Sequence, residues 1–284
     1  MPLRIASLGS SFAAGPGISP VIDAKAARSG ANYAHLLAAR LGGTATLTDL
    51  TVSGATLRNI LDEPQVVDGG RTVFAPQIEG LPQDSDVVLI LGGGNDIGYI
   101  GGLFMDSFEA YWLFRVAARI YHWFYPPEPE PEEQQKQLDT EALAARYGEV
   151  LDAVHARAPN ARVLVVEYLT VIGDDVRPGY IDVPFESRRL AHHRNVGEKV
   201  RVATVKAVQG RKNWCTRVPI AEPSAGHSLG TERPWVSGWG WGLLYAGGAY
   251  HPNAEGMVAV ARMIYEKMLG LGLAVDDREV TMDG

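Results

Sequence analysis

The chain has 284 residues, of which 46% are hydrophobic and 21% charged, a balance typical of globular proteins. Its formal net charge is −7, and no stretch of clustered Lys and Arg is evident, which argues against a nucleic-acid partner because phosphate binding needs a basic surface. The single cysteine, Cys215, excludes an internal disulfide and fits a reducing compartment.

The N-terminal sequence and the apolar runs bear on location. "MPLRIASLGSSF" passes from the first methionine into strand-like sequence, leaving no room for the apolar segment of a signal peptide. No apolar run reaches the roughly 18 residues that a membrane span needs. We therefore expect a cytoplasmic protein without stable membrane insertion. The sequence does not indicate the oligomeric state.

Apolar, strand-like segments alternate with helical patterns along the chain. The expected strands are 4–8, 44–50, 86–96, 161–169 and 214–220, and the expected helices are 32–42, 139–157, 186–208 and 253–269. Continuous apolar strands separated by helices are typical of a parallel sheet covered on both faces. The pattern predicts an α/β fold with about five central strands, and we expect residues 1–284 to form a single domain.

One connection, residues 99–135, is longer than is usual after a strand. We expect its first part, from Phe108 to Tyr125, to be an aromatic-rich helix, and the following "PPEPEPEE" to be solvated and extended. The segment is either a helix packed on the core followed by a surface loop, or a lid that forms an acyl-chain wall near an active site. A membrane-surface helix is the weakest alternative, because few basic side chains lie on its polar face.

Tryptophans concentrate in this insertion and in the loop 221–250. They either line an apolar pocket for an acyl chain or serve only as aromatic anchors for long loops. The tentative substrate-binding residues are Trp112, Trp123, Trp239 and Trp241.

The pentapeptide "GHSLG" at 226–230 matches the G-x-S-x-G nucleophile elbow of α/β-hydrolases, with Ser228 as the attacking residue. Such an elbow needs a strand before the serine and a helix after it. The flanking sequences "AEPSA" and "TERPWVSGWGWG" are rich in Pro, Gly and Trp and predict neither. Only His251 lies downstream, with no strand–helix unit to supply an acid before it. We interpret the match as coincidental.

Four turns lie at the ends of strands or at the start of a helix. They are "SLGSSFAAGPG" at 7–17, "TVSGATL" at 51–57, "GGGND" at 92–96 and "YHPNAEG" at 250–256. Open α/β sheets bind ligands at the carboxyl ends of their strands, so these turns are expected to meet at one edge.

In this order the turns resemble the four blocks of SGNH (GDSL-type) hydrolases. Their residues are most similar to those of actinobacterial esterases and lipases of that family. The resemblance implies a flavodoxin-like three-layer α/β/α sandwich and hydrolysis of a small-molecule or lipid carboxylic ester, with no cofactor and no metal. It makes Ser11 the nucleophile and His251 its general base. The Ser11 and Gly54 N–H groups and the Asn95 amide would bind the oxyanion.

Two positions depart from the family pattern. The usual G-D-S reads Gly9-Ser10-Ser11, and the aspartate of D-x-x-H is replaced by Gly248. His251 is therefore oriented either by a main-chain carbonyl near Gly248, which we expect, or by a distant carboxylate such as Glu222. A carbonyl stabilises imidazolium less than a carboxylate does, so modest turnover is expected.

The sequence leaves other functions open and contains other candidate residues. An acyltransferase or thioesterase would use the same site, and the missing aspartate keeps open an inactive binding protein with this fold. His192 and His193 are expected on a solvated helix face rather than as a metal pair. His35 is expected to pack, Cys215 to lie in the core, and Asp96 to hold the loop after the third strand.

Overall fold

The computed structural model describes residues 2–111, 138–179, 183–240 and 247–274. Its centre is a five-stranded sheet in the order β4-β1-β7-β8-β9, in which every neighbouring pair is parallel. The strands are β1 Leu3–Gly9, β4 Ala45–Asp49, β7 Val87–Leu91, β8 Arg162–Val166 and β9 Cys215–Val218. Each lies within or overlaps an expected strand, so the predicted α/β fold is confirmed.

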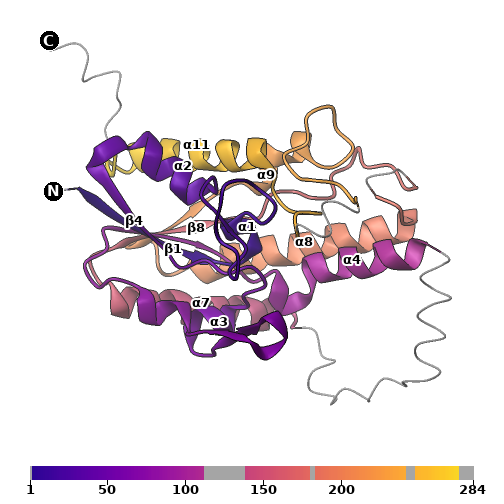
Figure 1. Cartoon of the computed structure of the whole chain (residues 1–284). Coiled ribbons are helices and arrows are strands. Elements are labelled where there is room, and N and C mark those ends of the chain that lie inside the picture. The colour runs from indigo at the N-terminus through magenta and orange to yellow at the C-terminus, as the bar shows by residue number, and fades with distance from the viewer. Residues whose placement is uncertain (1, 112–137, 180–182, 241–246, 275–284) are drawn as a thin grey trace, which may run out of the picture.

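Helices cover both faces of this sheet (Figure 1). The pair α2 and α11 packs on one face, and α7 and α8 pack on the other with α3 and α4 beside them. The helices are α1 Ser11–Ala14, α2 Tyr33–Arg40, α3 Leu57–Leu61, α4 Tyr99–Ala110, α7 Thr140–Arg157, α8 Ser187–Val208, α9 Ala221–Ser224 and α11 Ala254–Gly270. All five residues of β7 are buried, as a strand covered on both faces requires. The result is the expected three-layer sandwich.

The strand order brings the predicted turns together. Strand β1 lies between β4 and β7, with Ser7 opposite Asp49 on one side and Gly9 opposite Leu91 on the other. The turns that leave these three strands therefore start side by side at the carboxyl edge of the sheet, where open α/β folds bind ligands.

Two small antiparallel hairpins were not predicted. They are formed by β2 Val21–Asp23 with β3 Arg28–Ser29, and by β5 Gln65–Val67 with β6 Thr72–Phe74. Their strands are shorter than the runs of four to eight residues by which strands are recognised in a sequence. An ion pair between Lys25 and Asp68 links the two hairpins.

Of the helix expected from Phe108 to Tyr125, only residues 108–111 are described, and 108–110 form the end of a helix that begins earlier. Helix α4 starts at Tyr99, directly after Gly98 in a left-handed conformation (φ 64°), and Tyr111 is extended (φ −92°, ψ 117°). Its first turns bury Tyr99, Ile100 and Leu103 in the core, which explains why the helix starts directly after the β7 turn. Residues 112–137, and with them the Pro/Glu run, lie outside the described residues.

In the ranges that the structure describes, no helix is long and apolar enough to cross a bilayer. The expected cytoplasmic location stays a prediction.

Asn32 joins α2 and β4 near the functional edge. Its Oδ1 accepts hydrogen bonds from the N–H groups of Ala34 and His35 (both 3.1 Å), which caps α2, and its Nδ2 donates to Asp49 at the end of β4 (2.8 Å). The side chain is fully buried, so these bonds have no competition from water.

We predict that Asn32→Ala lowers the free energy of unfolding by about 2–4 kcal/mol. Loss of a cap costs about 1 kcal/mol, and a buried Asp49 oxygen that loses its partner costs about 1–3 kcal/mol more. Urea denaturation followed by circular dichroism measures the change. Asp139→Ala is the matched control, because Asp139 caps α7 at an exposed position with one bond to Ala142. Equal losses in the two variants would contradict the buried role of Asn32.

Candidate active site

Ser11 and His251 meet at the carboxyl edge of the sheet although 240 positions separate them in the chain. Ser11 is the first residue of α1, directly after β1, and His251 lies just before α11. The His251 Nε2 is 2.8 Å from the Ser11 Oγ. Both residues are only 5% exposed. A buried hydroxyl that contacts a ring nitrogen has the geometry of a nucleophile beside its base.

A main-chain carbonyl orients the imidazole. The His251 Nδ1 lies 2.7 Å from the carbonyl oxygen of Ala249. Because a carbonyl can only accept, the neutral ring carries its hydrogen on Nδ1, which leaves the Nε2 lone pair facing the Ser11 hydroxyl. We expected a carbonyl near Gly248, and the one that contacts the ring belongs to the next residue, Ala249. The Gly248 carbonyl instead accepts the backbone N–H of His251 (3.2 Å).

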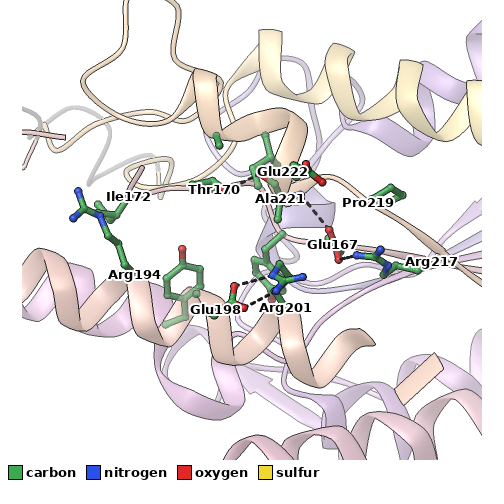
Figure 2. A pocket seen from close by; sticks show the side chains of 15 residues that line it. Glu167, Thr170, Ile172, Arg194, Glu198, Arg201, Arg217, Pro219, Ala221 and Glu222 are labelled. Carbon is green, nitrogen blue, oxygen red and sulfur yellow. Dashed lines mark hydrogen bonds and ion pairs between the residues drawn. The ribbon is translucent and has the colours of Figure 1, made fainter. Parts of the chain in front are cut away.

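Glu222, the alternative orienter, faces a different cavity. It is exposed on α9 and lines a cavity of about 470 Å³ at the carboxyl ends of β8 and β9 (Figure 2). His251 does not line this cavity. Four of its other charged groups pair, Glu167 with Arg217 and Glu198 with Arg201, and Arg194 donates to the Gly173 carbonyl.

The three predicted oxyanion donors lie on neighbouring turns. Gly54 is exposed with φ 83°, a left-handed conformation that favours glycine, in the turn after β4. Asn95 follows β7, and its Nδ2 donates to the carbonyl of Ala55 (2.9 Å), which ties these two turns together. An amide nitrogen carries a second hydrogen, so this bond leaves Asn95 a donor. The Ser11 N–H belongs to the first turn of α1, where helix N–H groups have no intrahelical partner.

Asp96 stabilises the turn after β7 through hydrogen bonds to neighbouring helices. Its fully buried carboxylate accepts hydrogen bonds from the Leu57 N–H (2.9 Å) and from Arg146 (3.3 Å). Burial raises the pKa of Asp96, against the effect of these two donors. The side chain thus joins α3 and α7 to the β7 turn, in agreement with the structural role that we expected.

Burial dominates the electrostatics of the histidine. It lowers the pKa of His251 from 6.5 to about 4, and the hydrogen bond to the Ala249 carbonyl opposes this shift. The imidazole is therefore neutral, the form that can accept a proton, over a wide range of pH.

Aromatic side chains surround the imidazole. The ring centroids of Phe12 and Phe104 lie 5.4 Å and 6.4 Å from that of His251. Phe104 also packs edge-on against Trp239 (6.1 Å) and Tyr250 (5.7 Å). Of the four tryptophans predicted to bind substrate, Trp239 therefore lies near the histidine. The other three lie outside the described residues.

Ser228 has none of the surroundings of a nucleophile elbow. It is fully buried and follows α9 and a 3-10 turn, Ala225–His227, rather than a strand.

The two adjacent histidines of α8 do not share a solvated face, and this expectation was wrong for one of them. His192 is exposed, but His193 is 2% exposed and its Nε2 lies 2.7 Å from Asp106 on α4. Burial lowers the pKa of His193, against the effect of Asp106. Consecutive residues point about 100° apart on a helix, so one can face the neighbouring helix while the other faces water.

His35 and Cys215 lie apart from the Ser11–His251 contact as structural side chains. His35 is half-buried beside Asp49 (3.4 Å), and Cys215 is buried, which raises the pKa of its thiol to about 12. No cluster of His, Cys, Asp or Glu able to hold a metal ion occurs within the described ranges.

Residues 7–259 match the model of the GDSL-like Lipase/Acylhydrolase family. The chain belongs to this family, and it is a carboxylic ester hydrolase. It is 29% identical over 282 residues to Lipase 2 of Streptomyces coelicolor, a match that covers 95% of this chain and 86% of the relative.

Two solved structures share the fold. An extracellular lipase from Streptomyces rimosus superposes with a TM-score of 0.64 at 23% identity, over 92% of this chain and 98% of the other. Phospholipase A1 from Streptomyces albidoflavus superposes with a TM-score of 0.66 at 18% identity, over 92% and 99%. These two matches confirm the fold inferred from the four sequence blocks, and the match to the family model confirms the family.

We predict that the His251 side chain titrates with a midpoint near pH 4, measured by the NMR chemical shifts of its ring. The unfolded chain takes up this proton near pH 6.5. The folded chain takes it up only near pH 4. The unfolded state therefore binds more protons between these values, and the free energy of unfolding falls as the pH drops through this window. A midpoint at or above pH 6.5 would show that burial does not lower the pKa of the His251 ring.

Proposed function

We propose that Ser11 and His251 form a Ser–His dyad that hydrolyses carboxylic esters through an acyl-enzyme. The observation that carries this proposal is the hydrogen bond between the Ser11 Oγ and the His251 Nε2. The ring tautomer set by the Ala249 carbonyl supports it, because Nε2 is then free to accept a proton.

The reaction has two halves. The Ser11 oxygen attacks the ester carbonyl carbon as its proton moves to Nε2, and the imidazolium then gives that proton to the departing alcohol as the carbon–oxygen bond breaks. In the second half, water loses a proton to Nε2 and attacks the acyl-serine. The acid leaves, and Ser11 regains its proton from His251.

The negative charge that develops on the carbonyl oxygen needs donors on the opposite side. We assign this role to the backbone N–H groups of Ser11 and Gly54 and to the Asn95 amide. Removing one such donor typically costs about 3–4 kcal/mol of transition-state stabilisation. The imidazolium itself receives only a carbonyl bond, so a turnover below that of enzymes with an aspartate is expected.

The aromatic side chains beside His251 favour an ester with an apolar group. Phe104 and Trp239 present ring surface near the imidazole, and burial of each methylene of an acyl chain against such a surface is worth about 0.8 kcal/mol. The lipase and phospholipase among the similar proteins agree with this choice. We propose a lipid or small-molecule ester with an apolar acyl chain as the substrate.

Ser11→Ala is expected to abolish hydrolysis of p-nitrophenyl acetate and labelling by a fluorophosphonate, because both need the nucleophile. Ser228→Ala is expected to keep both.

Glu222→Gln is expected to keep kcat within about tenfold of wild type, whereas loss of the acid of a true triad costs on the order of 10⁴.

Peptide mapping of the fluorophosphonate adduct to Ser228 would overturn the assignment. A 10⁴-fold loss in Glu222→Gln would replace the dyad with a triad. A wild-type protein that neither reacts with the probe nor hydrolyses esters would instead be a binding protein with this fold.

The acyl-chain proposal predicts that Phe104→Ala reduces the gain in kcat/KM per added methylene. In the wild type each buried methylene is worth up to about fourfold in kcat/KM, and a truncated wall buries less of the chain. A series of p-nitrophenyl esters from acetate to octanoate measures this slope. Acetate, which is too short to reach the wall, should be hydrolysed at a similar rate by both proteins.

Phe108→Ala is the control on the same helix. Phe108 packs on Trp239 with a centroid distance of 5.0 Å but lies one turn farther along α4 than Phe104. A slope unchanged in Phe104→Ala, or changed equally in the two variants, would remove Phe104 from the acyl site.

A further inference from the structure

The hydroxyl of Tyr168 joins the two turns that carry the proposed nucleophile and the proposed oxyanion amide. Tyr168 follows β8 at the carboxyl edge of the sheet and is 8% exposed. Its Oη lies 3.1 Å from the Ser10 Oγ, next to Ser11, and accepts a hydrogen bond from the Gly94 N–H (3.0 Å), next to Asn95.

The directions of these bonds are mutually consistent. The Gly94 N–H uses an acceptor site of the phenol oxygen, so the single hydroxyl hydrogen of Tyr168 is available to the Ser10 Oγ. In this arrangement one buried hydroxyl accepts from the β7 turn and donates to the β1 turn.

Ser10 is turned toward Tyr168 rather than toward its own helix. It is the N-cap residue of α1, and a serine at this position usually accepts a hydrogen bond from an N–H group of the first turn. Here the Ser10 side chain makes no cap bond. Ser10 stands where related enzymes are expected to have an aspartate, and its hydroxyl fixes the nucleophile turn to the residue after β8.

Ring packing also keeps Tyr168 beside the turn that carries Ser11. The ring of Tyr168 lies 4.6 Å from that of Phe12, the residue after Ser11, and the Phe12 ring in turn lies beside His251. A Cβ added at Gly94 would lie 2.8 Å from the Tyr168 Oη, so only glycine allows the backbone to approach the phenol this closely.

We infer that Tyr168 is a positioning residue that sets the spacing between the Ser11 N–H and the Asn95 amide, and hence the geometry of the oxyanion hole. This inference rests on the proposed function. Tyr168 touches neither the ester nor the water. It acts through Ser10 and Gly94, each of which is one peptide bond from an oxyanion donor.

The consequence is a selective effect on the transition state. Displaced donors bind the oxyanion less well but leave ground-state binding of the ester nearly unchanged. Tyr168→Phe keeps the ring on Phe12 and removes only the hydroxyl. We expect kcat for p-nitrophenyl butyrate to fall about 10- to 100-fold with KM within about threefold of wild type, because complete removal of one donor costs 10²–10³.

Butylboronic acid provides a second measurement, because its adduct with the serine oxygen places a negatively charged oxygen in the oxyanion hole. Its inhibition constant is expected to rise in Tyr168→Phe by a factor similar to the loss in kcat. Tyr265→Phe is the matched control, because it removes a buried tyrosine hydroxyl on α11, under Arg40 and away from the three turns. It should leave kcat and boronate inhibition unchanged.

Fluorophosphonate labelling separates the outcomes. If wild type is inactive or Ser11→Ala stays active, the proposed function fails. If wild type is active through Ser11 and Tyr168→Phe keeps full kcat, the positioning role is wrong. It is also wrong if KM rises as much as kcat falls, or if boronate inhibition does not weaken.

If Tyr168→Phe does not fold, Ser10→Ala, which removes the partner of the same hydroxyl, carries the test. A fall in kcat with unchanged KM and weaker boronate binding in Ser10→Ala supports the inference. Full activity in that variant overturns it.

Discussion

The neutral, buried imidazole of His251 is the constraint on which the rest of the site depends. A ring withdrawn from water and bonded to a carbonyl has no charged partner to hold it, so its position must come from the backbone around it. The strand-like pairing of residues 235–237 with 250–253 provides this. The Tyr250 N–H donates to the Ser237 carbonyl and the Ser237 N–H to the His251 carbonyl (both 2.8 Å). Val236 and Pro252 form a bridge between the same segments.

The adjoining residues extend this support in two directions. Asn253 caps α11 through the Gly256 N–H and donates to the Pro234 carbonyl (2.7 Å), so one side chain joins the histidine turn to the helix and to the preceding loop. Tyr250, held in a left-handed conformation (φ 58°), places its hydroxyl against Ser107 of α4. A carbonyl in place of a carboxylate also avoids the cost of burying a negative charge beside the neutral ring, but it stabilises imidazolium less.

The features that could be read from the sequence are those that a residue type or a periodic pattern defines. Ser11, Gly54, Asn95 and His251 each follow a recognisable strand or precede a helix, so the sequence placed them at one edge of the sheet. Their proposed roles came from the resemblance to the family. The carbonyl of Ala249 could not be assigned, because every residue has one and only the turn decides which points at the ring.

Tertiary packing accounts for the other differences. The burial of His193 depends on how α8 meets α4, and the position of Tyr168 depends on the neighbouring strands of the sheet. The residues of both contacts are visible in the sequence, but the sequence does not show which of them lie next to each other in the fold. The hairpin strands were missed for a different reason, since two or three residues are too few to show a period.

The separation of Ser11 and His251 along the chain has a consequence for synthesis. At typical rates of about 5–20 residues per second, a ribosome needs roughly 10–50 s to make the residues between them. The proposed nucleophile is thus made well before its proposed base. The central strands that position Ser11 can form earlier, but the histidine arrives only with α11, which docks against α2. A nascent chain therefore holds the serine without its proposed base, and the two residues meet only when α11 has joined the fold.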